Sequence, residues 1–298
     1  MPTSDATTGR TGDTSAPGVG ELVAGKYRVE HVLGRGGMGV VLLAVHEQLE
    51  DRVALKVLLP EVARDQDVVD RFIHEARAAK SLRSENVVRV LDIGTLESGT
   101  PFMVMEFLEG EDLNALIERG GPLPVVDAVD HVLQAMVALA EAHASGLVHR
   151  DLKPANLFLT QRSDGSPLVK VLDFGISKRY QPDLVGGAKL AQTQRLMGSP
   201  LYMSPEQLRS VRLVDGRSDL WSLGVTLFEL TTGRCPFEAE SMSAVMISIA
   251  NDPPMTFERL GVAVPDGFEA VVMRCLEKDP ARRFASAAEL SQALVPYA

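Results

Sequence analysis

Residues 149–156, HRDLKPAN, place three side chains with complementary chemistry within a few positions of one another. Asp151 could accept a proton, Lys153 could supply a positive charge, and Asn156 could offer an amide oxygen to a metal ion. Seventeen residues after Asn156, Asp173 follows the apolar run LVKVL and adds a carboxylate that could bind a second metal ion. Each piece alone could be an ordinary polar loop or turn. Their order and spacing together predict a site that surrounds a transferring phosphate.

A glycine-rich stretch at 34–39, GRGGMG, is a second candidate for phosphate binding. Glycines let backbone amides approach phosphates closely, although this pattern alone is weakly specific. A dinucleotide-binding fold would begin a helix directly after the last glycine, and a Walker loop would need Gly-Lys-Ser/Thr, which is missing here. Because VVLLAV follows and predicts a strand, we expect a hairpin turn. By itself this pattern would also fit an ordinary glycine-rich hairpin.

A lysine and a glutamate form a further candidate pair. Lys56 lies in the run RVALKVL, where the two-residue period of a strand turns it to the same face as Ala54. Nineteen residues later, Glu75 lies in the helical stretch RFIHEARAAKSL and could reach inward to pair with Lys56. This stretch is no zinc-protease motif, because the fourth residue after His74 is Ala78 rather than histidine.

The hydrophobic pattern predicts a sheet-rich part followed by a helical part. Short β-branched runs and one helical pattern, at 68–82, precede residue 107. Further helices are expected at 112–119, 124–144, 217–232, 241–250, 266–277 and 286–294. Residues 1–20 hold almost no apolar side chain, so we predict a disordered tail at this end.

Composition narrows the class of protein. The chain has 298 residues, 45% of them hydrophobic, which suits one large domain or two closely packed lobes. No apolar run is long enough to cross a bilayer, and the start of the chain does not resemble a signal peptide. Cys235 and Cys275 have no metal-ligand spacing, so a reducing cytoplasm is expected. A net charge of −10 argues against a nucleic-acid partner.

Together these motifs resemble those of the eukaryotic-like (Hanks-type) serine/threonine protein kinases, particularly the bacterial ones, over about residues 26–294. The resemblance implies an α+β fold with two lobes, a small antiparallel β-sheet lobe with one helix and a larger, mostly helical lobe. The expected boundaries are a disordered tail over 1–24, the N-lobe over 25–107 and the C-lobe over 108–298.

The activity implied by the resemblance is transfer of the γ-phosphate of ATP to serine or threonine hydroxyls of protein substrates. Autophosphorylation of the activation loop, in a signalling role, and self-association for transfer between copies would accompany it. Asp151 would orient the hydroxyl and accept its proton, while Lys153 steadies the γ-phosphate. Lys56, positioned by its ion pair with Glu75, would hold the other phosphates. Two Mg²⁺ ions, for which Mn²⁺ can substitute, would bind to Asn156 and Asp173.

By matched position, the residues that contact ATP would come from the glycine-rich hairpin, the adenine pocket, the hinge and the ribose site. They are Leu33, Gly34, Arg35, Gly36, Gly37, Met38, Gly39, Val41, Ala54, Lys56, Met105, Glu106, Leu108, Asp112 and Phe158. Within this set, Met105 would lie at the back of the adenine pocket, and Asp112 would contact the ribose.

Activation in this family implies a basic pocket for a phosphate on the activation loop. By matched position the pocket would be formed by Arg71, Arg150 and Lys178, with Thr193 as the expected phosphosite. The same residues could instead be three independent surface cations.

The stretch GSPLYMSPE resembles the substrate-docking loop, to which Ser199, Pro205 and Glu206 would belong. The resemblance further implies that Glu206 pairs with Arg283. Asp219 would brace the catalytic loop.

Two alternatives of other classes stay open on the sequence. A pseudokinase scaffold would keep the fold and lose a catalytic residue, whereas the chain has all of Lys56, Glu75, Asp151, Asn156 and Asp173. A small-molecule phosphotransferase of related fold would not need a peptide-docking loop. The chain departs from the family at Ala155, where some kinases that prefer basic substrates have glutamate.

Overall fold

The computed structural model describes residues 16–174, 200–210 and 214–298, and its contacts divide the chain into two units. The first unit contains the described residues up to Val69 together with Leu91–Phe107. The second contains Asp70–Val90 and the described residues from Leu108 to Ala298. Each unit has its own hydrophobic core and is described by itself.

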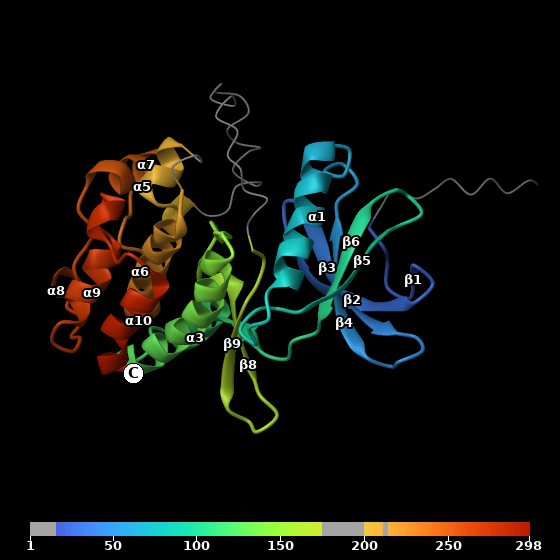
Figure 1. The fold of residues 1–298 in the computed structure, drawn as a ribbon, viewed down its shortest axis with the longest axis horizontal. Helices are drawn as coiled ribbons and strands as arrows, with labels where there is room; N and C mark the ends of the chain where they lie inside the picture. Colours follow the sequence, from blue (N-terminus) through green and yellow to red (C-terminus); the bar gives the residue numbers. More distant parts are fainter. Residues whose placement is uncertain (1–15, 175–199, 211–213) are drawn as a thin grey trace, which may run out of the picture. The chain divides into compact units, whose positions relative to one another are not determined.

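A six-stranded sheet forms the first unit (Figure 1). Its strands are β1 (Leu22–Val23), β2 (Tyr27–Arg35), β3 (Gly39–His46), β4 (Arg52–Leu58), β5 (Val90–Thr95) and β6 (Pro101–Glu106). Their order is β1-β2-β3-β4-β6-β5, with β1 to β4 and β6 joined by antiparallel pairs. Alternate side chains of β3, among them Val40, Leu42 and Ala44, enter the core, as the two-residue period predicts.

The start of the described chain differs from the tail predicted over residues 1–24. Leu22 and Val23 pair with Arg28 and Tyr27 in the sheet, and Val23 is buried in its core. The Gly20 amide also donates to the Val29 carbonyl at 2.8 Å. A strand of two residues is too short to produce a recognisable alternating pattern in the sequence.

Helix α1 (Gln66–Ser81) begins in the first unit and lies in the second from Asp70 onward. Its buried face includes Phe72, Glu75 and Ala79. These positions recur every three or four residues, which is the spacing of one helix face.

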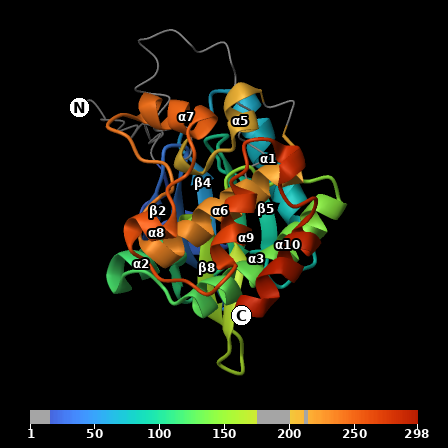
Figure 2. The same cartoon turned by 90° about the vertical axis from the view of Figure 1, so that its left-hand side faces the viewer.

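Two long helices, α3 (Val125–Ala144) and α6 (Gly216–Thr232), pack against each other in the second unit. Almost every residue of α6 is buried, because α3, α9 and α10 all contact it (Figure 2). The other helices are α2 (Leu113–Gly120), α5 (Pro205–Arg209), α7 (Met242–Asn251), α8 (Phe257–Leu260), α9 (Phe268–Cys275) and α10 (Ala287–Leu294).

A small antiparallel sheet carries the polar loops of the second unit. Its strands are β7 (Glu111–Asp112), β8 (Leu157–Gln161) and β9 (Pro167–Val171), with a short 3₁₀ helix at Pro154–Asn156 directly before β8. Residues 149–156 therefore lead into β8, and Asp173 follows β9.

Among the described residues, no helix combines the length and the apolar character that crossing a bilayer requires.

Candidate active site

The glycine-rich stretch forms the predicted hairpin between β2 and β3. Leu33, Gly34 and Arg35 end β2, and Gly39 begins β3. The turn of Gly36, Gly37 and Met38 is closed by a hydrogen bond from the Gly36 amide to the Gly39 carbonyl at 2.9 Å. A Cβ on Gly39 would lie 2.5 Å from the Val57 carbonyl oxygen, so a side chain does not fit at this position.

Four of the expected ATP-contacting residues share one face of the sheet in the first unit. Val41 and Lys56 are cross-strand partners, as are Ala54 and Met105. Lys56 and Ala54 are two residues apart on β4, so both pairs point to the same face. Glu106 ends β6 opposite Val53. This face combines apolar side chains with a half-buried lysine.

The other expected ATP-contacting residues lie in the second unit. Phe158 of β8 pairs with Asp112 of β7, and Leu108 is half-buried just before this sheet. Asp112 is also the N-cap of α2, because its carboxylate accepts the Ala115 amide at 2.9 Å. Asp112 therefore has a structural task besides any contact with a ligand.

The structure brings Asp151, Lys153 and Asn156 together. The Asn156 side-chain nitrogen donates to the Asp151 backbone carbonyl at 2.7 Å and to its carboxylate at 3.1 Å. The Lys153 ammonium lies 3.6 Å from the same carboxylate. These contacts hold a partly exposed carboxylate between an amide and a cation, as the spacing of the motif predicts.

Asp219, at the start of the buried helix α6, holds the loop that carries Asp151. Its carboxylate accepts the backbone amides of His149 at 2.9 Å and Arg150 at 2.8 Å. Arg150 has a φ of +67°, an uncommon conformation for a side chain other than glycine. The two hydrogen bonds stabilise this strained backbone next to Asp151, so Asp219 braces the loop as expected.

His149 connects the loop to the segment around Asp173. Its ring nitrogen Nε2 donates to the Leu172 carbonyl at 3.0 Å, and Nδ1 accepts the Asp151 amide at 3.2 Å. This tautomer is neutral, and complete burial lowers the pKa of His149, although Asp219 acts in the opposite direction. The ring also packs against Phe174, with centroids 5.0 Å apart. Asp173 itself has a φ of +45°.

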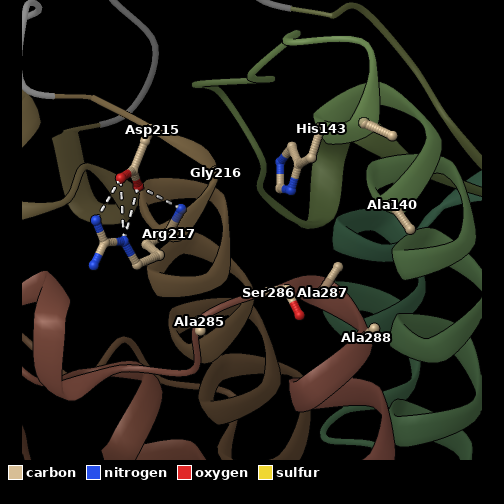
Figure 3. Close-up of a pocket in the computed structure, with 10 residues that line it drawn as sticks. Ala140, His143, Asp215, Gly216, Arg217, Ala285, Ser286, Ala287 and Ala288 are labelled. Atoms are coloured by element: carbon tan, nitrogen blue, oxygen red, sulfur yellow. Dashed lines mark hydrogen bonds and ion pairs between the residues drawn. The ribbon is translucent and has the colours of Figure 1, made fainter.

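A residue that the motifs did not reveal also contacts Asp219. Nε2 of His143, near the end of α3, lies 2.7 Å from the Asp219 carboxylate. His143 lines a pocket of about 530 Å³ whose wall includes alanines of α3 and of residues 285–288, at and just before the start of α10 (Figure 3). The ring faces Gly216, where a Cβ would lie 2.7 Å from Nδ1. The partners are 76 residues apart in sequence, so spacing could not have paired them.

A second pocket, of about 470 Å³, has two arginines in its wall. It is lined by Arg71, Asp70 and His74 of α1 together with Arg150 and residues 146–148. The Nε atom of Arg71 is buried and has no hydrogen-bond partner within the described residues. The structure therefore brings together two of the three expected phosphate-binding cations.

The residues expected to anchor the docking loop lie at helix α5. Ser204 caps this helix in a capping box with Gln207, whose side-chain nitrogen donates to the Arg150 carbonyl at 3.0 Å. Pro205 and Glu206 form its buried first turn. The expected ion pair is present, because Arg283 donates to both carboxylate oxygens of Glu206 at 2.7 and 2.8 Å.

Three expected site residues, Lys178, Thr193 and Ser199, lie outside the described residues. Lys56 belongs to the first unit and Glu75 to the second, so their ion pair stays a prediction.

Residues 27–295 match the model of a known family, described as the protein kinase domain. The chain belongs to the protein kinase domain family. The kinase domain is similar in fold to the crystal structure of the Mycobacterium tuberculosis PknI kinase domain, with a TM-score of 0.71 and 29% identity. The match covers 95% of this chain and 99% of the PknI chain. The expected family and protein kinase fold are confirmed.

Two curated bacterial proteins are similar to the chain over most of its length. Serine/threonine-protein kinase pkn3 of Myxococcus xanthus is 41% identical over 93% of this chain and 51% of its own length. Serine/threonine-protein kinase PknB of Mycobacterium leprae is 35% identical over 91% of this chain and 42% of its own. The chain thus spans about half the length of pkn3, and less of PknB.

The half-buried His131 predicts a loss of stability in mild acid. Burial lowers the pKa of His131 on α3 below its ordinary value of 6.5, although Asp127 and Asp130 raise it. Below pH 6.5 the unfolded chain therefore binds more protons than the folded chain. The free energy of unfolding decreases as the pH falls through this range. One such group changes the unfolding free energy by at most about 1.4 kcal/mol per pH unit.

Urea unfolding at pH 7.5, 6.5 and 5.5 measures this loss. The variant His131→Gln should lose less stability between pH 6.5 and 5.5 than the unmodified protein does. His31→Gln, at an exposed position of the first unit, serves as the control for replacing a histidine. Identical pH dependence in His131→Gln and the unmodified protein would contradict the prediction.

Proposed function

We propose that this chain is a serine/threonine protein kinase that transfers the γ-phosphate of ATP to hydroxyls of protein substrates. The observation that carries the proposal is the loop of residues 149–156. In this loop Asp151, Lys153 and Asn156 lie in contact, and two hydrogen bonds from the loop amides to Asp219 hold it. A pseudokinase would keep the contacts of the fold, such as those with Asp219, but would not need Asp151, Lys153 and Asn156 together.

In this proposal the work of the chain is positioning and electrostatics. Asp151 orients the substrate hydroxyl and accepts its proton, which requires its carboxylate to be ionised and correctly aimed. Asn156 and Lys153 hold that carboxylate in place. Lys153 also offers positive charge to the transferring phosphate, where a preorganised cation stabilises developing negative charge. Lys56, oriented by Glu75, plays the same part for the other phosphates.

Asn156 and Asp173 suit the metal ions that protein kinases use. The side-chain nitrogen of Asn156 is committed to Asp151, and within the described residues its side-chain oxygen makes no hydrogen bond. An amide oxygen and a carboxylate are ligands that Mg²⁺ prefers, and Mn²⁺ accepts the same set. When bound, Mg²⁺ would neutralise charge on the phosphate oxygens.

We further propose the ATP contacts, lobes and location that the resemblance implies. Residues 25–107 and 108–298 would act as the two lobes. The boundary between Phe107 and Leu108 is also a boundary of the two units, whereas Asp70–Val90 belong to the second unit. The hairpin, the face with Lys56 and the pair Asp112–Phe158 would contact ATP. A cytoplasmic location is supported by Cys235 and Cys275, both buried free thiols.

Incubation of the purified chain with labelled ATP, Mg²⁺ and a generic protein acceptor tests the proposal. We expect label on serine and threonine of the acceptor and of the chain itself. Label on neither protein would favour the pseudokinase, and label only on small molecules would favour a small-molecule phosphotransferase.

Activation is expected to depend on Thr193 and on the pocket lined by Arg71 and Arg150. A phosphate on Thr193 would form charge-assisted hydrogen bonds in this pocket, each worth about 1.5–3 kcal/mol. Thr193→Ala, which cannot carry this phosphate, and Arg71→Gln should therefore each be about tenfold or more less active than the unmodified enzyme phosphorylated on Thr193.

The double variant decides between a shared pocket and independent surface cations. If Thr193 and Arg71 act together, the double variant should be no worse than either single one, as expected for coupled residues. Arg77→Gln, an exposed charge on the same helix, is the control. Mass spectrometry that finds Thr193 unmodified in active enzyme, or additive losses, would refute the prediction.

Substrate choice should depend weakly on an arginine two residues before the acceptor. Ala155 is exposed on the short helix at 154–156 and carries no carboxylate to bind such an arginine. In a peptide array, Ala155→Glu should raise the preference for that arginine a few-fold, as expected for a partly exposed ion pair of up to ~1 kcal/mol. A strong arginine requirement in the unmodified enzyme would overturn this expectation.

A further inference from the structure

We infer that Glu141 is a positioning residue that fixes the end of helix α1 relative to the catalytic loop. The inference rests on the proposed kinase function, because part of its test measures phosphoryl transfer. Glu141 belongs to none of the motifs in the sequence, and the contacts that identify it join residues almost sixty positions apart.

The half-buried carboxylate of Glu141 binds two consecutive backbone amides. One oxygen accepts the amide of Arg83 at 2.8 Å, and the other accepts the amide of Ser84 at 2.7 Å. Helix α1 ends at Ser81, so these are among the first amides after the helix. Hydrogen bonds to a charged acceptor are short and about twice as strong as those between neutral groups. Glu141 therefore ties the end of α1 to α3.

Residues 86–88, which follow this anchor, are hydrogen-bonded to β9. The Asn86 side chain donates to the Val169 carbonyl at 2.8 Å, and the Val171 amide donates to the Asn86 carbonyl at 2.7 Å. The Val88 amide continues this pairing with the Val171 carbonyl at 3.1 Å. Asn86 is buried, whereas Arg83 is exposed. Glu141 thus holds the part of the segment nearest to α1, which β9 does not reach through these bonds.

The last turn of α3 connects this anchor to the catalytic loop. Two residues after Glu141, His143 contacts the Asp219 carboxylate that binds the amides of His149 and Arg150. One helical turn therefore determines where α1 ends and where the loop lies. Since α1 carries Glu75, the proposed partner of Lys56, a shift of α1 would misplace a group that acts on the phosphates.

A carboxylate is the side chain suited to this task. It presents two acceptor oxygens, one for each amide, whereas glutamine presents one oxygen and an NH₂ group. In Glu141→Gln the NH₂ would face a backbone N–H, so one amide would lose its partner. Losing a hydrogen bond to a charged acceptor costs enough to change a rate by about tenfold where the contact supports the active arrangement.

Two measurements on the full chain test the inference, with Asp130→Asn as a control that removes one charge from an exposed position of the same helix. Hydrogen exchange of residues 82–86 should be faster in Glu141→Gln than in the control. In phosphatase-treated enzyme, kcat with Mg²⁺ and ATP should fall by about tenfold, while KM for the peptide stays constant. Glu141→Asp keeps the charge on a shorter side chain and should show an intermediate loss of kcat.

The outcomes separate the inference from the proposed function. Two outcomes would overturn the role of Glu141. One is unchanged hydrogen exchange in residues 82–86 of Glu141→Gln, and the other is a kcat of Glu141→Gln equal to that of the control. An inactive unmodified enzyme would instead refute the proposed kinase function, and faster exchange in Glu141→Gln would then still support the anchor.

Discussion

Asp151→Asn is expected to abolish, or nearly abolish, transfer of phosphate to serine and threonine. Removing a general base costs roughly 10²–10⁴-fold in rate. The amide has almost the size of the carboxylate, and its oxygen can still accept the Asn156 side chain and face the Lys153 ammonium, so the loop should keep its shape. The loss should therefore appear in kcat, with little change in the KM for ATP.

Lys56→Met removes a charge proposed to act in the same reaction, and it should reduce activity to a similar degree. Lys56 belongs to the first unit. Its loss would be electrostatic, because methionine keeps the apolar stem and removes the charge offered to the phosphates. Asp266→Asn and Lys80→Met change exposed residues and should leave the rate constant unchanged. Labelled ATP measures the rate constant of each variant and of its control, and mass spectrometry locates the phosphate. Undiminished activity in Asp151→Asn would disprove the role assigned to this carboxylate.

The longer helices were predictable because their patterns are long and their ends carry local signals, whereas the short helices α5 and α8 were not predicted. The predicted ranges 124–144 and 217–232 differ from α3 and α6 by one residue at most. Asp215 caps α6 with its side chain, and Gly233 ends it in the left-handed conformation that favours glycine. The catalytic loop was predictable for another reason, since its residues lie close in sequence and their types suit one reaction.

The contacts that position the site were harder to predict. His143 and Glu141 are common residue types, and their partners lie 76 and about 57 residues away. No periodicity or spacing connects such residues until the chain has folded. The same holds for the positive φ of Arg150, next to which the backbone amides bind Asp219. Sequence reasoning thus found the groups that could react and missed two that hold them.

The largest loss of stability is expected from Glu206→Ala. Glu206 and Arg283 are 5% and 2% exposed, so each is charged in a place that water hardly reaches. Burial by itself would raise the pKa of Glu206, but the hydrogen bonds from Arg283 and Ser218 hold it below 4.5. Removing the carboxylate leaves the guanidinium buried without its counter-charge, which costs about 3–5 kcal/mol.

Three carbonyl acceptors of Arg283, on Glu277, Arg217 and Lys278, do not offset this loss, because they carry no full negative charge. Arg283→Met removes the other charge and should destabilise to a similar degree, while the double variant should recover part of the loss. Glu238→Gln breaks the exposed pair with Arg234 and should cost no more than ~1 kcal/mol. Urea unfolding at pH 7.5 measures all four variants. A loss in Glu206→Ala no larger than in Glu238→Gln would mean that packing around Trp221, rather than the ion pair, anchors this part of the second unit.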